Sequence, residues 1–292
     1  MAGNSAKREF TCSECGWTNA KWVGQCGECQ AWNSLVEGAS GGGRGLGAVR
    51  SIKPAAIVGS SAAKPITDVS TERVSSRSTS VSEFDRVLGG GLVPGAVVLL
   101  SGEPGVGKST LLLEVAANTA KSGARVLYIS GEESVGQIRL RAERTGALSD
   151  NLLIASETDL SSVLGQIEAV KPELLVVDSV QTIAASELDG AAGMPAQIRE
   201  VAANLIRVAK TTNLPVILVG HVTKDGSIAG PRVLEHLVDV VCHFEGDRQT
   251  SLRFVRSLKN RFGPTDEVGC FEMTGEGIRE VTDPSGLFLS RP

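Results

Sequence analysis

The pattern of apolar and polar positions along this 292-residue chain changes character at about Pro65. Beyond that point, short apolar runs bounded by Gly, Pro or polar residues alternate with stretches of helical periodicity. Such alternation predicts an α/β domain with a mainly parallel sheet, because parallel strands are buried on both faces. The predicted core strands are Ala96–Ser101, Arg125–Ser130, Leu174–Ser179 and Pro215–His221.

Two stretches between these strands place apolar residues on one helical face. The first contains Leu112, Val115, Ala116 and Thr119, and the second contains Ile198, Val201, Ala202, Leu205, Val208 and Ala209. After about Val240 the helical periodicity ends. The runs that follow predict successive antiparallel strands with Gly-containing turns; they are VVCHFEG, LRFVRSLKN, EVGCFEM and GIREV.

The residues before Pro65 divide into two further parts. Residues 38–64 are rich in Gly, Ala and Ser without any period, which predicts a flexible linker. We therefore expect three regions: a small N-terminal module at residues 1–37, the linker at 38–64, and the α/β domain at 65–292.

The N-terminal module contains four cysteines spaced C-x2-C-x10-C-x2-C: Cys12, Cys15, Cys26 and Cys29. Each C-x2-C pair can present two thiolates to one ion, and two pairs complete a tetrahedron. This spacing predicts a closed, structural Zn²⁺ site whose metal stabilises a segment too small to build a core. Trp17, Trp22 and Trp32 either pack around the site or offer a stacking surface.

Composition limits the classes of partner. The net charge of −4 gives no overall attraction to nucleic acid, so any contact with DNA requires local basic patches. No apolar run approaches the length of a membrane span, and the N-terminus lacks the apolar region of a signal peptide. We therefore expect a cytoplasmic protein without membrane partners, whose cysteines are thiols or metal ligands.

The run GEPGVGKST matches the phosphate-loop pattern G-x4-G-K-[ST] and lies between a predicted strand and a predicted helix. Its backbone N–H groups and the helix N-terminus suit phosphate oxygens, which predicts a nucleotide site. Lys108 is expected to reach the β- and γ-phosphates, and Ser109 to ligate Mg²⁺. The predicted nucleotide-binding residues of the run are Gly102, Glu103, Pro104, Gly105, Val106, Gly107, Lys108, Ser109 and Thr110.

Four further side chains lie at or just past the ends of core strands, at the edge where parallel-sheet ligands bind. Asp178 ends one strand and is expected to hold the Mg²⁺ water shell. Glu132 is favoured as the base that orients water, with Glu133 as the alternative. His221 ends another strand and is expected to sense the γ-phosphate, unless it is an ordinary half-buried histidine.

Taken together, these motifs resemble the RadA (Sms) family of bacterial RecA-like ATPases over essentially the whole chain. The resemblance is carried by the four-cysteine finger with KWVGQC, by LGGGLVPG before the phosphate loop, and by YISGEES, VGHVTKDGSIAGPRVLEH and KNRFG. The last run is the most specific to the family.

The resemblance implies a RecA-type fold and DNA-dependent ATP hydrolysis, with a homo-oligomeric ring, in the form of a hexamer, holding ATP between subunits. It further implies branch migration or unwinding of recombination intermediates, on single-stranded or branched DNA and together with RecA. The family carries a C-terminal Lon-like domain, and we expect this chain to lack it. The alternative function is an ATP-switched DNA-binding scaffold without motor activity.

The resemblance also suggests two DNA-facing loops. One follows Asp178 within Ala184–Pro195 and contains no cation; the other follows His221 and includes Lys224 and Arg232. In the KNRFG run, Lys259 and Arg261 alternate along a strand and so share a face. We expect them to act in trans on the γ-phosphate of a neighbouring subunit. Direct contact with DNA is the alternative.

Overall fold

A computed structural model of the chain describes residues 9–13, 15, 17–38, 63, 65–68, 75–221, 230–246 and 250–282. Two compact units are present, Met1–Ile66 and Thr67–Pro292, and each is described by itself. Nearly all of the predicted linker, and Lys224 in the second predicted loop, lie outside the described residues. Within the described part of the chain, no helix combines the length and apolar character needed to cross a membrane.

The N-terminal unit contains a three-stranded antiparallel sheet of order β2-β1-β3. Its strands are β1 (Glu9–Cys12), β2 (Thr18–Asn19) and β3 (Leu35–Gly38). Cys12, Cys26 and Leu35 are buried with Trp17 and Val23 packed against them. This apolar cluster is very small, so the unit needs a metal to be stable on its own.

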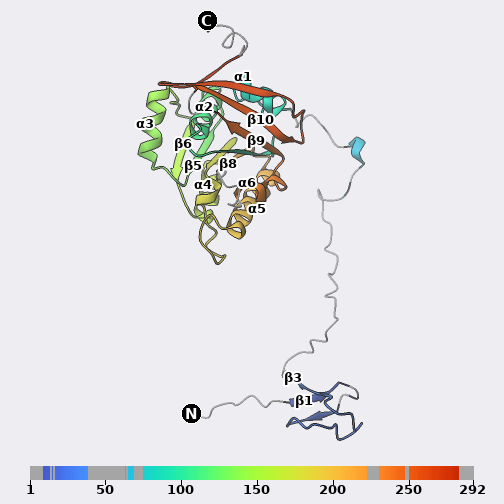
Figure 1. Cartoon of the computed structure of the whole chain (residues 1–292). Coiled ribbons are helices and arrows are strands. Elements are labelled where there is room, and N and C mark those ends of the chain that lie inside the picture. The colour runs from blue at the N-terminus through green and yellow to red at the C-terminus, as the bar shows by residue number, and fades with distance from the viewer. Residues whose placement is uncertain are drawn as a thin grey trace. The chain divides into compact units, whose positions relative to one another are not determined.

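The larger unit is built on a nine-stranded sheet of order β12-β11-β10-β9-β4-β8-β7-β5-β6 among the described residues (Figure 1). The four predicted core strands of its parallel part are buried, whereas β6 is half-buried. The strands are β4 (Val97–Gly102), β5 (Val126–Ser130), β6 (Leu152–Ser156), β7 (Leu174–Asp178), β8 (Val216–His221) and β9 (Val240–Glu245).

Three antiparallel strands extend the sheet beyond β9. They are β10 (Leu252–Asn260), β11 (Val268–Thr274) and β12 (Gly277–Glu280), and each pairs with the strand before it. The predicted antiparallel run is therefore confirmed. In addition, β9 pairs in parallel with β4, so it joins the two parts into one sheet.

Helices cover both faces of the sheet, and alternate strand residues separate the two cores. Val98, Leu100 and Tyr128 pack with helices on one face, whereas Val97, Leu99 and Leu127 pack with helices on the other. The first face carries α1 (Ser82–Leu88), α2 (Lys108–Lys121) and α3 (Val135–Thr145). The second carries α4 (Leu160–Val170), α5 (Pro195–Thr212) and α6 (Gly230–Glu235). Short 3₁₀ turns cover Ile66–Asp68 (η2) and Val180–Thr182 (η3).

Candidate nucleotide site and zinc ribbon

The phosphate-loop residues turn sharply between the carboxyl end of β4 and the N-terminus of α2. Gly105 (φ 77°) and Gly107 (φ 112°) occupy the left-handed region that side chains with a Cβ avoid. Gly107 caps α2, and its carbonyl accepts the first helical hydrogen bonds from Thr110 and Leu111. Ser109 is the second residue of the helix and is half-buried. The backbone N–H groups of this turn thus converge at a helix N-terminus, as anion binding requires.

The side chain of Lys108 packs against this turn and is almost fully buried. Its ammonium group donates to the carbonyl oxygens of Gly102 (2.8 Å) and Glu103 (2.8 Å). Burial lowers the pKa of Lys108 to about 8, and the negative charges of Asp178 and Glu132 partly oppose this shift. The lysine and the two carboxylates are therefore close enough to interact electrostatically.

Asp178 ends β7 and is buried at 4% exposure. Its Oδ2 accepts a hydrogen bond from the Tyr128 hydroxyl at 2.7 Å. Its Oδ1 is buried without a hydrogen-bond partner among the described residues. A buried carboxylate oxygen without a partner is costly, so this oxygen fits a divalent cation or its water shell.

Glu132 and Glu133 lie just past β5, but their surroundings differ. Glu132 Oε1 accepts from the Ser179 hydroxyl at 2.7 Å and lies 3.0 Å from His221 Nε2. Glu133 instead forms an ion pair with Arg141 of α3 at 2.7 Å. The arrangement gives Glu132 two neighbours from the carboxyl ends of adjacent core strands, which favours it over Glu133 as the group that handles water.

His221, at the end of β8, is also fixed through its backbone. Gln181 accepts from the His221 N–H and donates to its carbonyl oxygen, both at 3.0 Å. Gln181 belongs to η3, which directly follows Asp178 and Ser179. The segment between Asp178 and the first predicted DNA-facing loop is therefore tied to the end of β8, from which the second predicted loop follows.

Sequence reasoning missed Tyr128, Ser179 and Gln181. Ser179 and Gln181 directly follow the predicted magnesium residue, which was a usable signal. The only sequence feature that marked Tyr128 is its hydroxyl group within a mostly apolar run. A buried hydroxyl group needs a hydrogen-bond partner, but the sequence did not indicate which one.

Lys259 and Arg261 lie near the amino ends of the parallel strands, whereas the phosphate loop lies at their carboxyl ends. Asn260 pairs with Val240, and Val240 pairs with Val98 of β4. From there β4 runs four residues to Gly102, or ~13 Å. This separation is too large for either cation to contact the phosphate loop of its own chain.

Both cations face the segment that follows α6. Lys259 Nζ donates to the carbonyl oxygens of Glu235 (2.8 Å) and Val238 (2.7 Å), and Arg261 lies 3.5 Å from Asp239. Asn260 points elsewhere and donates to Leu88, so the two cations share a face. Arg232 lies in α6, and its side chain is outside the described residues.

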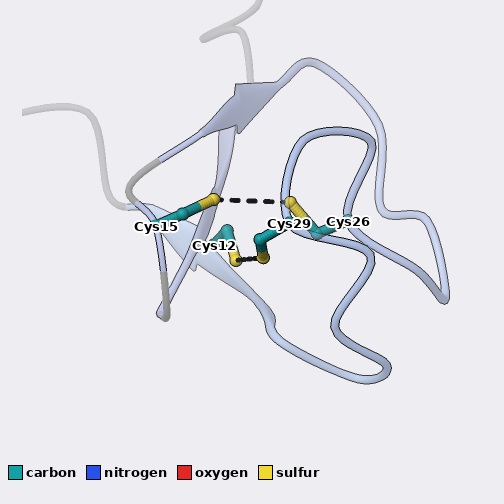
Figure 2. A group of neighbouring side chains, drawn as sticks. All are labelled: Cys12, Cys15, Cys26 and Cys29. Carbon is teal, nitrogen blue, oxygen red and sulfur yellow. Dashed lines mark hydrogen bonds between the residues drawn. The ribbon is translucent and has the colours of Figure 1, made fainter.

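The four cysteines of the N-terminal unit converge on one point (Figure 2). All four sulfur atoms lie within 4.8 Å of one another. Cys12 and Cys29 are 3.7 Å apart, and Cys15 and Cys26 are 3.6 Å apart. Four sulfurs bound tetrahedrally at a Zn–S distance of about 2.3 Å would be about 3.8 Å apart. The cluster therefore fits a zinc ion.

The three tryptophans of this unit differ in exposure. Trp17 packs over Gly27, whose added Cβ would lie 3.0 Å from the indole ring. Trp22 and Trp32 are 55% and 73% exposed. Only Trp17 therefore has the packing role that is common for tryptophan.

Comparison with known proteins agrees with this division of the chain. The AAA domain family matches residues 64–227, and a rubredoxin metal binding domain matches residues 10–37. The fold and site are thus those of an ATPase-type α/β domain preceded by a zinc ribbon.

Similar proteins narrow the class further. The chain is 55% identical to the DNA repair protein RadA of Mycolicibacterium smegmatis, covering 100% of this chain and 63% of the relative. It is 48% identical to that of Halalkalibacterium halodurans and 46% identical to that of Bacillus subtilis, covering 97% of this chain and 61% of each relative. The chain therefore belongs to the AAA domain family, and over nearly its whole length it is similar to DNA repair protein RadA. It spans about three-fifths of the length of these relatives.

Proposed function

We propose that this chain is a DNA-dependent ATPase of recombinational DNA repair. In this proposal it promotes branch migration or unwinding of recombination intermediates in the cytoplasm. Its substrates are single-stranded or branched DNA, and it acts together with RecA. The names of the relatives, DNA repair protein RadA, support the repair role, and the AAA domain supports ATP use.

The observation that carries the proposal is the contact of Glu132 with Ser179 and His221 beside the phosphate loop. A side chain that orients water must lie near the γ-phosphate position and be held in one orientation. Glu132 meets the second condition through two partners. Its charge also acts on Lys108, which supports the first.

Each residue then has a distinct task. The phosphate loop binds the phosphates through backbone N–H groups, and Lys108 neutralises charge on the β- and γ-phosphates. Asp178 and Ser109 would hold Mg²⁺, which supplies positive charge at the phosphates when bound. Glu132 orients the attacking water, and His221 responds to the γ-phosphate and passes the change to the segment that follows it.

A complete site needs a second subunit in this proposal. Because Lys259 and Arg261 cannot reach the phosphate loop of their own chain, we propose that they complete the ATP site of a neighbour in a ring, in the form of a hexamer. DNA contact is assigned to Lys224, which precedes α6 in the sequence, and to Arg232, which lies within α6. This geometry would couple DNA binding, through α6, to the cations presented to the next subunit.

The test is ATP turnover with and without single-stranded DNA at low salt, repeated over a salt series. We expect DNA to raise turnover, and we expect the stimulation to fall as salt competes for the DNA phosphates. Turnover that does not respond to DNA, combined with nucleotide-dependent DNA binding, would identify the chain as an ATP-switched scaffold instead.

A further inference from the structure

Tyr128 is the only tyrosine in the chain, and its side chain is fully buried in strand β5. Its ring belongs to the apolar core on the face covered by α2 and α3. Its hydroxyl group donates to Asp178 Oδ2 at 2.7 Å. A phenol is protonated at neutral pH, so it can donate to a carboxylate.

The sheet register explains why these two residues meet. Tyr128 lies opposite Val176, and Ser130 lies opposite Asp178 in the parallel β5–β7 pair. Tyr128 and Asp178 are thus diagonal neighbours on one face, a spacing that long side chains can bridge. The contact requires β5 and β7 to be adjacent, although they are separated in the sequence by β6.

The two carboxylate oxygens of Asp178 have different surroundings. One oxygen is held by Tyr128, and the other is buried without a hydrogen-bond partner in the described part of the chain. Rotation about the terminal torsion of an aspartate is soft, so without a donor the carboxylate could turn both oxygens. The hydroxyl group therefore fixes the orientation of the carboxylate.

We propose that Tyr128 is a positioning residue for the divalent cation that accompanies the nucleotide. It holds Asp178 so that Oδ1 is presented to the cation or to its bound water. The inference rests on the proposed nucleotide site, but not on hydrolysis. Groups that orient a metal-binding side chain in this way commonly change metal affinity by 10–100-fold when removed.

The first experiment is Tyr128→Phe, which keeps the ring and removes only the hydroxyl group. A fluorescent ADP analogue is bound to the full chain while Mg²⁺ is titrated. We expect the half-saturating Mg²⁺ concentration to rise about tenfold. Binding at excess Mg²⁺ and binding in EDTA should both be unchanged. Tyr128→Phe in an Asp178→Asn background should have no further effect, because the two groups act as one unit.

Thr119→Val is the matched control, because it removes another buried hydroxyl group, on α2, that has no partner among the described residues. It should leave the Mg²⁺ titration unchanged. If Tyr128→Phe also leaves it unchanged, Tyr128 serves only the core and the proposal is wrong. A wild-type chain whose nucleotide binding ignores Mg²⁺, or which binds no nucleotide, would overturn it as well.

A second measurement does not depend on the folding of the variant. Uniform labelling with 3-fluorotyrosine gives one ¹⁹F resonance, because the chain has a single tyrosine. Adding Mg²⁺ to the nucleotide-bound chain should shift this resonance, and Asp178→Asn should abolish the shift. An unmoved resonance in the wild-type chain contradicts the proposal. If the resonance shifts but no ATP is hydrolysed, the proposed ATPase function fails and the role of Tyr128 remains.

Discussion

The ammonium group of Lys259 donates to the carbonyl oxygen of Glu235 at 2.8 Å, where α6 ends. It also donates to Val238, and Arg261 lies beside Asp239. Burial, together with the neighbouring charge of Arg261, lowers the pKa of Lys259. The two cations of the KNRFG run therefore contact the last residue of α6 and the segment that follows it.

The first prediction concerns Lys259→Ala and Arg261→Ala. If these cations complete a neighbour's ATP site, each variant should lower DNA-stimulated ATP turnover by about a hundredfold or more, as for other arginine fingers. DNA affinity should stay within about twofold, since no phosphate contact with DNA is lost. Turnover and DNA affinity are measured on the same preparations.

Arg256→Ala is the matched control for this pair. Arg256 lies on the same strand as Lys259, is half-exposed, and pairs with Glu245 instead of the segment after α6. It should change turnover and DNA affinity little. If Lys259→Ala or Arg261→Ala weakens DNA binding, reduces its salt dependence and spares the basal turnover, the cations contact DNA directly.

The second prediction separates the two glutamates after β5. Glu132→Gln removes the charge that faces Ser179 and His221, and should reduce turnover by about a hundredfold or more while nucleotide affinity is kept. Glu133→Gln disturbs only the ion pair with Arg141 and should cost less than about tenfold. Single-turnover hydrolysis and equilibrium nucleotide binding measure the two effects, and the opposite order of effects would assign the role to Glu133.

The third prediction follows from the buried ammonium group of Lys108, whose pKa burial lowers to about 8. In the unfolded chain this pKa is about 10.4. Between these values the unfolded state binds more protons than the folded state, so the free energy of unfolding rises with pH. Below pH 8 Lys108 is charged in both states, so the burial of its charge lowers the free energy of unfolding by the full amount. Lys108→Met should remove this rise in the nucleotide-free protein.

The measurement is chemical denaturation followed by far-ultraviolet circular dichroism from pH 7 to pH 10. The wild-type chain should gain stability relative to Lys108→Met as the pH increases. Lys121→Met is the matched control, because Lys121 lies exposed at the other end of α2 and should follow the wild type. Parallel curves for the wild type and Lys108→Met would show that Lys108 carries no such penalty.

Local sequence patterns were sufficient for much of the fold. The four predicted core strands became β4, β5, β7 and β8, and the two predicted helical faces are buried in α2 and α5. These features depend on periodicity and on turn residues, which are local. Strand β6 was not predicted, although its run LLIAS is as apolar as the runs of β5 and β7, and in the structure it is only half-buried.

The contacts of the site that the sequence did not predict depend on the order of strands in the sheet. Tyr128 contacts Asp178 only because β5 lies beside β7, and Lys259 lies far from the phosphate loop only because β10 runs antiparallel to β9. Periodicity predicts that a strand exists but not which strand lies next to it. The residues of the phosphate loop could be predicted because they are contiguous in the sequence. The partners of Ser179 and Gln181 could not be predicted, because they lie far away in the sequence.

The last prediction concerns zinc. The four cysteine sulfurs converge in a unit whose apolar cluster is very small, so the metal should supply most of its stability. A chelator that binds zinc but leaves Mg²⁺ in solution should release one zinc ion per chain and unfold this unit. Trp17, Trp22 and Trp32 are the only tryptophans in the sequence, so tryptophan fluorescence reports on this unit alone.

The ATPase-type unit should keep its circular dichroism and its nucleotide binding during chelation, because its sheet and both of its cores are built from residues after Thr67. Cys26→Ser should reproduce the fluorescence change and lower the zinc content. Cys242→Ala is the matched control: Cys242 is fully buried in β9, and burial raises the pKa of its thiol to about 12, so it should remain an inert thiol. A loss of helical signal on chelation would instead show that the zinc ribbon is needed for the stability of the larger unit.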